Sequence, residues 1–336
     1  MRNKGLVFVV TALLAVVLTF ALAFVALDSP PMIARLIRHT FTVPDFDPDF
    51  EPDRIAEFMD SSQVRPIGYT CLTIVVLLIV LGFIAEKSGL SSAGAILFFL
   101  PTVGYFARHM FFLAGLGVLR ALWLPFWRDL MKLGDIVYVP HIIVALPLAH
   151  AGLRRLAVFP AFLMIGLGFF LFVSAVQAWL YAKLRGRGTV DFWLYRFSRH
   201  PQYLGWILWS YGLMLFASQV GVMRADNPGA GLPWVISSLI IICAALAEEV
   251  KMQRERGEEY AAYRRATPFM FPLPKSISAL IAAPLRLVLK KDRPENRKDL
   301  FVTFAVYLSI MMILSAPFLL LDIPGRGGWI LWPRVR

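Results

Sequence analysis

Two short polar motifs in this apolar chain carry side chains that could bind a charged ligand. The first is RHPQYLG at residues 199–205, and the second is the acidic pair Glu248-Glu249. Pro201 has no N–H group and has a backbone angle suited to a helix, so we expect it to begin a helix with His200 at its cap. The free N–H groups and positive dipole end of that helix start, beside the cations Arg199 and His200, favour an anion such as a carboxylate.

Two apolar stretches lie between these motifs and must position them. One covers about residues 203–223 and the other about residues 232–247, and the loop between them is short. Helices joined by a short loop form an antiparallel hairpin. We therefore expect the acidic pair to return to the side of the membrane that holds the first motif.

A polar segment follows the acidic pair. It contains GEEYAAYRR at residues 257–265, and Pro268 is expected to end its helix near Thr267. Tyr260 and Tyr263 are three residues apart and so share one face of that helix. Aromatic residues near a membrane interface are often anchors, so both an anchoring role and a place in the site stay open for these tyrosines.

The ordered set of motifs resembles the isoprenylcysteine carboxyl methyltransferase and phospholipid methyltransferase family. That family combines an Arg-His-Pro-x-Tyr-x-Gly box, a helical hairpin, a Glu-Glu pair and a Gly-Glu-Glu-Tyr-x-x-Tyr segment before a proline-terminated tail. The likeness covers about residues 159–274 and includes Gly166-Leu167-Gly168, similar to the Gly-x-Gly element of the phospholipid methyltransferases. Such glycines in membrane helices also serve helix packing. The chain departs from the family pattern at residues 192–196 and at Arg256, which bears on the substrate more than on the cofactor.

The resemblance implies methyl transfer from S-adenosylmethionine, with no metal, to a lipophilic small molecule such as a lipid or a prenylated compound. The zwitterionic end of this cofactor needs an anion site and an acidic partner. No catalytic residue is assigned, because direct methyl transfer depends on alignment and water exclusion. The implied cofactor-binding residues are Arg199, His200, Pro201, Tyr203, Gly205, Glu248, Glu249, Tyr260, Tyr263, Gly166 and Gly168.

Two alternative functions are compatible with these motifs. A membrane reductase of the sterol and steroid type resembles the same C-terminal fold and has a similar Arg-His-Pro box, but it uses NADPH. Those enzymes tend to carry an acid after the box glycine, where this chain has Trp206. The other alternative is a non-enzymatic transporter or scaffold; a transporter should carry charges near the middle of its spans, and this chain has few.

Composition indicates an all-α, polytopic transmembrane bundle. Hydrophobic residues make up 58% of the chain, in runs of about twenty residues that can cross the hydrocarbon core. The net charge of +12 comes from basic residues beside apolar runs. Positive-inside bias and contact with membrane lipids account for them, so nucleic acid binding is not expected. Cys71 and Cys243 fall in predicted spans, and neither a disulfide framework nor a metal site is expected.

The apolar pattern predicts about 8–9 spans. They are placed at residues 6–27, 67–85, two within 92–127, 136–152, 159–182, 203–223, 232–247 and 301–321. The loop at 28–66 holds eight acids against four Lys or Arg, whereas the loop at 183–199 is strongly basic. The positive-inside rule therefore places the first loop outside and the candidate cofactor site on the cytoplasmic face, although Arg154-Arg155 opposes the rule. Arg108-His109 is interpreted as a hairpin tip or as an intramembrane functional pair.

Three regions follow from this organisation. Residues 1–155 form an N-terminal transmembrane region of unknown role, residues 156–274 a methyltransferase-like membrane core, and residues 275–336 a basic surface segment with the last span. Residues 275–299 mix apolar and basic side chains, as in a helix lying on an anionic membrane surface.

Overall fold

The computed structural model of the protein describes residues 4–27, 65–99, 128–219, 231–291 and 293–320. These residues form helices joined by turns, and no strand occurs among them. The all-α class is therefore confirmed. The second span predicted within 92–127, the Arg108-His109 pair and nearly all of the acidic loop at 28–66 lie outside the described residues.

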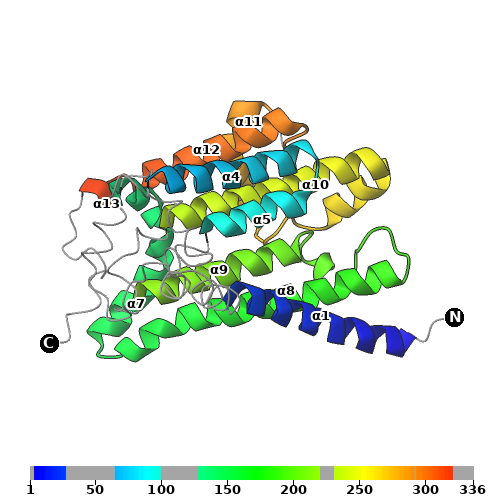
Figure 1. Ribbon diagram of the computed structural model, residues 1–336, viewed down its shortest axis with the longest axis horizontal. Coiled ribbons are helices and arrows are strands. Elements are labelled where there is room, and N and C mark those ends of the chain that lie inside the picture. Colours follow the sequence, from blue (N-terminus) through cyan, green and yellow to red (C-terminus); the bar gives the residue numbers. More distant parts are fainter. Residues whose placement is uncertain (1–3, 28–64, 100–127, 220–230, 292, 321–336) are drawn as a thin grey trace, which may run out of the picture.

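Long helices run side by side along the longest axis of the molecule (Figure 1). They are α1 (Lys4–Leu27), α8 (Phe159–Leu184), α9 (Pro201–Gln219), α10 (Gly231–Ala266) and α12 (Arg297–Ser315). By length and apolar composition, four described helices can cross a membrane, and these are α1, α8, α10 and α12. This supports a multi-pass membrane protein, whereas the predicted total of about 8–9 spans is not confirmed.

The helices α4 (Arg65–Ile84) and α5 (Ser88–Phe99) form a hairpin that packs on α10 (Figure 1). At the close crossing of these two helices, a Cβ on Gly82 would lie 2.5 Å from the Ser91 backbone nitrogen. The turn between them, at residues 85–87, lies at the same end of the molecule as the polar half of α10.

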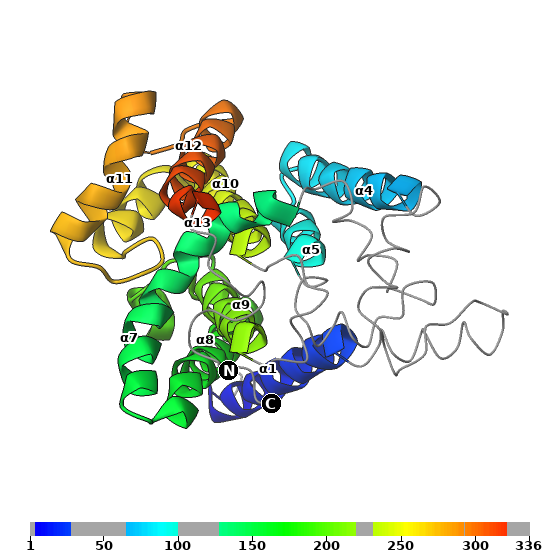
Figure 2. The same ribbon diagram turned by 90° about the vertical axis from the view of Figure 1, so that its left-hand side faces the viewer.

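The span predicted at residues 136–152 is not formed. The chain there divides into the 3₁₀ helix η3 (Arg128–Tyr138) and α7 (Val139–His150). Twelve helical residues cover about 18 Å, less than the hydrocarbon core of about 30 Å. Figures 1 and 2 show α7 lying across one end of the bundle rather than along it.

Specific contacts hold η3 in this crosswise position. A Cβ on Gly134 would lie 2.0 Å from the Leu232 nitrogen, so only a glycine lets η3 approach the start of α10 this closely. The Tyr211 hydroxyl donates to the Val137 carbonyl oxygen at 2.7 Å, and the Ile136 N–H donates to Ser315 Oγ at 3.2 Å. Apolar character alone therefore did not determine the path of this segment.

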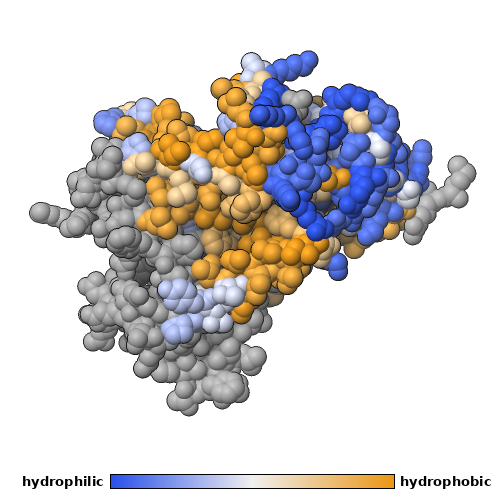
Figure 3. All heavy atoms as spheres, turned by 90° about the horizontal axis from the view of Figure 1, so that it is seen from above, coloured by the Kyte–Doolittle hydropathy of each residue, from blue (hydrophilic) through white to orange (hydrophobic). Residues whose placement is uncertain are grey.

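The helix α10 has two unlike halves. Its apolar half ends at Ala247, and the polar half from Glu248 to Ala266 continues past the ends of the neighbouring helices (Figure 1). Gly257 breaks it with φ 53° and ψ −122°, a backbone conformation that favours glycine. Hydrophilic side chains gather at this end of the molecule, next to an apolar middle (Figure 3).

The basic segment after α10 forms a helix on the side of the bundle, α11 (Lys275–Leu289), followed by a turn that leads into α12 (Figure 1). Leu280 and Leu287 on α11 are 73% and 80% exposed. The side chain of Asn296 caps α12 by accepting from the Asp299 N–H at 2.9 Å. The shorter helices η4 (Arg154–Val158), η5 (Trp193–Arg196) and α13 (Pro317–Leu320) complete the described fold.

Candidate functional site

The first predicted motif forms the start of α9. The helix begins at Pro201, as the sequence predicts, and the Leu204 N–H donates to the His200 carbonyl oxygen at 3.0 Å. The preceding backbone is anchored as well, because the Arg199 N–H donates to the Pro268 carbonyl oxygen at 3.0 Å. The start of α9 is therefore tied to the chain that follows α10.

Arg199 and Glu249 form a buried two-point ion pair. Arg199 Nε donates to Glu249 Oε1 at 2.6 Å, and Arg199 Nη2 donates to Glu249 Oε2 at 3.1 Å. Only 10% of the Arg199 side chain and 7% of the Glu249 side chain are exposed. Arg199 Nη1 also donates to the carbonyl oxygens of Arg264 at 2.9 Å and Thr267 at 2.5 Å. Arg199 therefore joins the start of α9 to Glu249 at the beginning of the polar segment and to the backbone at its end.

His200 lies between the two carboxylates. Its Nε2 is 3.2 Å from Glu249 Oε1, and its Nδ1 is 3.8 Å from Glu248 Oε2. Since an ionised carboxylate only accepts hydrogen bonds, the shorter contact requires an N–H on Nε2. Glu249 therefore accepts from both His200 and Arg199, which compensates its burial.

Glu248 is the more accessible of the two carboxylates, with 30% of its side chain exposed. The Tyr203 hydroxyl donates to its Oε1 at 2.6 Å, and the Ser88 hydroxyl donates to the same oxygen. Ser88 begins α5 and is 160 residues away in sequence. The sequence analysis missed Ser88, because a lone serine between two apolar helices carries no signal for a pairing over that distance.

Tyr260 and Tyr263 lie together, with ring centroids 6.1 Å apart, but their hydroxyl groups differ. The Tyr263 hydroxyl donates to the Tyr195 carbonyl oxygen at 2.7 Å. Tyr260 is 1% exposed, and its hydroxyl has no hydrogen-bond partner among the described residues. A buried polar atom without a partner is rare in folded proteins, which makes this hydroxyl a candidate to contact a bound molecule.

The glycines predicted for the cofactor lie away from these side chains. A Cβ on Gly168 would lie 2.3 Å from the Trp209 nitrogen, and one on Gly205 would lie 2.7 Å from the Phe172 nitrogen. These two glycines therefore let α8 and α9 pack closely. An added Cβ on Gly166 would have no atom of the described residues within 4 Å. Cofactor binding by these glycines stays a prediction, while the helix packing is observed.

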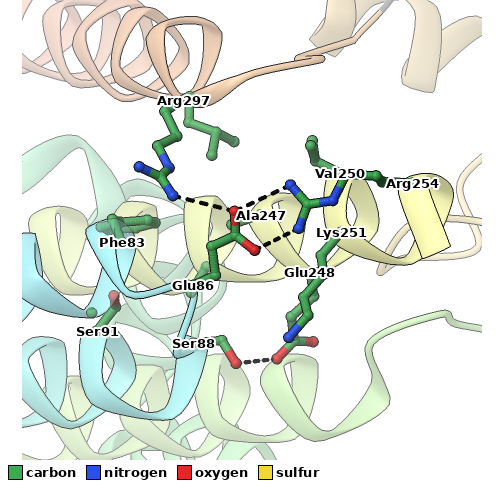
Figure 4. A pocket seen from close by; sticks show the side chains of 13 residues that line it. Phe83, Glu86, Ser88, Ser91, Ala247, Glu248, Val250, Lys251, Arg254 and Arg297 are labelled. Atoms are coloured by element: carbon green, nitrogen blue, oxygen red, sulfur yellow. Dashed lines mark hydrogen bonds and ion pairs between the residues drawn. The ribbon is translucent and has the colours of Figure 1, made fainter.

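A small pocket lies on the other side of the Ser88–Glu248 contact (Figure 4). The turn between α4 and α5, the middle of α10 and the start of α12 line it. Arg254 donates to Glu86 with Nη1 at 3.2 Å and Nη2 at 2.6 Å, and Arg297 Nη2 donates to the same carboxylate at 3.2 Å. Chiefly through the Arg254 hydrogen bond, these contacts lower the pKa of Glu86 to about 2.

The comparison with protein families covers the region that contains this cluster. Residues 126–267 match a family described as "Protein of unknown function (DUF1295)". This is a family of membrane proteins related in general to the superfamily of steroid 5-alpha reductases and isoprenylcysteine carboxyl methyltransferases. The predicted resemblance is confirmed at that level, and the match selects neither a methyltransferase nor a reductase. No curated protein and no solved structure matches the chain.

The adjacent carboxylates Glu248 and Glu249 differ in their hydrogen-bond partners. Glu249 has both oxygens engaged by Arg199 and one also by His200, so it is a structural counter-ion. Glu248 Oε1 accepts from two hydroxyl groups, and among the described residues its Oε2 has only the longer contact to His200. A partly exposed carboxylate with an oxygen left over can accept from a cationic ammonium or from sugar hydroxyl groups.

Proposed function

We propose that the protein is an integral membrane methyltransferase that uses S-adenosylmethionine and methylates a lipophilic acceptor. The observation that carries the proposal is Glu248, a partly exposed carboxylate held by Tyr203 and Ser88 beside a buried histidine and a buried arginine. When bound, S-adenosylmethionine supplies an activated methyl group on a positively charged sulfur. Its amino acid end carries a positively charged ammonium group, which the negatively charged Glu248 carboxylate can bind.

The residues of the cluster have separate roles in this proposal. Glu248 accepts from the ammonium group or from the ribose hydroxyls, and Tyr203 and Ser88 hold that carboxylate in place. The buried Tyr260 hydroxyl offers a further hydrogen bond to the bound molecule. Arg199 holds the start of α9 against the polar half of α10. The two helices can therefore orient the bound molecules and exclude water from the site.

The acceptor is expected to enter from the bilayer. The cluster lies where the apolar half of α10 ends, and the hydrophilic end of the molecule borders an apolar middle (Figure 3). Each buried methylene group contributes about 0.8 kcal/mol to binding, which favours an acceptor with a long apolar portion. The strongly basic loop at residues 183–199 supports a cytoplasmic position for the site.

The test is a titration of the purified full chain with S-adenosylmethionine, comparing the wild type with Glu248→Gln. We expect the variant to bind at least about tenfold more weakly, since about 1.4 kcal/mol corresponds to the loss of one charge-assisted hydrogen bond. The matched control is Glu258→Gln, an exposed acid on the same helix that pairs with the exposed Arg265.

Equal affinity of the wild type and a folded Glu248→Gln variant would contradict the assignment of Glu248. The family match is equally compatible with a reductase, so NADPH is titrated in parallel. Saturable binding of NADPH with no binding of S-adenosylmethionine would replace the methyltransferase proposal by the reductase alternative.

A further inference from the structure

The pocket beside Glu86 brings together three cations from two helices. Arg254 and Lys251 come from the polar half of α10, and Arg297 comes from the first turn of α12 (Figure 4). The side chains of Arg254 and Arg297 are 60% and 58% exposed, so a ligand can reach them. We call this site the Glu86 pocket.

The lining of the pocket carries three cations against two carboxylates, Glu86 and Glu248. Glu86 is shared by two guanidinium groups, which leaves one positive charge over. Lys251 Nζ lies 3.9 Å from Glu255 Oε1, too far for a hydrogen bond. Glu248 also lines the pocket and keeps its negative charge, since Tyr203 and Ser88 are neutral donors to it, so the lining as a whole has one positive charge in excess. The pocket therefore favours an anion.

The two arginines keep donors available for such an anion. A guanidinium has five N–H donors. Among the described residues, Arg254 uses two of its terminal nitrogens on Glu86, and Arg297 uses one. The remaining donors belong to two planar groups that converge from different helices. That arrangement suits the oxygens of a phosphate or a carboxylate, which arginine binds at two points.

Apolar side chains line part of the pocket as well. Phe83 at the end of α4 and Leu300 in the first turns of α12 line it. Their neighbours Ile84 and Phe301 are 55% and 72% exposed, on helices whose outer surfaces are apolar. The pocket therefore lies where an apolar helix surface meets a cationic rim, a position that fits a molecule with a charged head and an alkyl chain.

We propose that the Glu86 pocket binds the acidic headgroup of a membrane amphiphile, a phosphate or carboxylate carried on an alkyl chain. Ser88 and Glu248 form the wall between this pocket and the candidate cofactor cluster, so the bound headgroup lies next to that cluster. The inference rests on the charges and shape of the pocket and does not depend on S-adenosylmethionine.

The experiment is native mass spectrometry of the purified full chain in a neutral detergent, without S-adenosylmethionine. The probes are dioleoyl phosphatidic acid, dioleoyl phosphatidylcholine and inorganic phosphate. We expect one phosphatidic acid to bind saturably, at least tenfold more tightly than phosphatidylcholine. The double variant Arg254→Gln/Arg297→Gln should weaken that binding at least tenfold, whereas Arg265→Gln, an exposed arginine on the same helix, should leave it unchanged.

A second variant separates loss of the pocket from loss of the fold. Glu86→Gln releases both arginines from their shared carboxylate, so it should bind phosphatidic acid more tightly than the wild type, a change that unfolding cannot produce. Equal binding of the two lipids, or unchanged binding in the double variant, would overturn the proposal. Inorganic phosphate that competes at the same affinity as the lipid would overturn the assignment to an amphiphile. None of these outcomes bears on the methyltransferase proposal, which the S-adenosylmethionine titration tests by itself.

Discussion

At the scale of single residues, the cluster contains one carboxylate that stabilises the fold and one that is available to a ligand. Glu249 is buried and satisfied by Arg199 and His200, and Glu248 is partly exposed. A buried charge that loses its partner costs far more than an exposed one, because it stays out of water without compensation. Substitutions at these neighbouring positions should therefore change different properties of the protein.

Replacement of Glu249 by glutamine should destabilise the protein strongly. Arg199 would remain buried with no negative partner, a loss of about 3 kcal/mol in the free energy of unfolding. The measurement is the thermal unfolding midpoint in detergent, followed by tryptophan fluorescence. Glu258→Gln serves as the control, because that side chain is 78% exposed and pairs with an exposed arginine. Equal midpoints for the two variants would show that the Arg199–Glu249 pair does not stabilise the fold.

Substitutions of the two tyrosines of the polar segment should likewise affect different properties, one stability and the other ligand binding. Tyr263→Phe removes the hydrogen bond to the Tyr195 carbonyl oxygen, so we expect a stability loss of about 1 kcal/mol. Tyr260→Phe removes a hydroxyl that has no partner among the described residues, so stability should not fall. If Tyr260 contacts the cofactor, this variant should instead bind S-adenosylmethionine more weakly. An unchanged affinity would leave Tyr260 as a packing residue.

At the scale of elements, glycines determine how closely α8 and α9 approach. An added Cβ on Gly168 meets the backbone of Trp209, which cannot move aside as a flexible side chain could. The facing Gly205 meets the backbone of Phe172 in the same way. The start of α9 carries Arg199 and His200 into the cluster, so the position of this helix against α8 also sets the position of the site.

Gly168→Ala should therefore force α8 and α9 apart, at a cost of about 1–3 kcal/mol for overpacking. Gly166→Ala, two residues away on the same helix, meets no atom within 4 Å in the part of the chain that the structure describes and is the matched control. Thermal unfolding midpoints of the two variants give the comparison. A Gly166→Ala variant as unstable as Gly168→Ala would indicate that loss of glycine from α8, and not the close approach of the helices, causes the effect.

At the scale of the whole molecule, the described termini of several helices meet at one polar end. The start of α1, the turn between α4 and α5, the loop between α8 and α9 and the polar half of α10 all lie there (Figure 1). The turn between α7 and η4 lies at the opposite end (Figure 1). The basic loop lies at this end, so the positive-inside rule predicts that the polar end, with the cofactor site proposed above, faces the cytoplasm.

This orientation predicts the labelling of single cysteines in intact cells. With Cys71 and Cys243 replaced by alanine, Arg187→Cys in the basic loop should be protected from a membrane-impermeant thiol reagent, and the exposed Leu153→Cys should react. Permeabilised cells, in which both positions should react, provide the control. Labelling of Arg187→Cys alone in intact cells would reverse the orientation and remove the access of the site to a cytosolic cofactor.

The sequence by itself determined the helical membrane character of the chain and the pairing of its two polar motifs. Pro201 marks the start of α9 because proline suits a first helical residue, and the apolar lengths on either side of a short loop return Glu248 and Glu249 to His200 and Tyr203. These features are local, or follow from helix length, so the residue pattern contains them.

Only the tertiary structure decided the features that depend on distant contacts. The segment at residues 136–152 has the composition of a span, yet the 3₁₀ helix η3 at its start packs on α10 and α12, and α7 lies across the end of the bundle. Ser88 donates a hydrogen bond to Glu248 from a position 160 residues away in the sequence, and Arg199 pairs with Glu249 and not with Glu248. Side-chain burial and charge pairing are properties of the packed molecule, so two adjacent glutamates with the same local sequence signal acquired different roles.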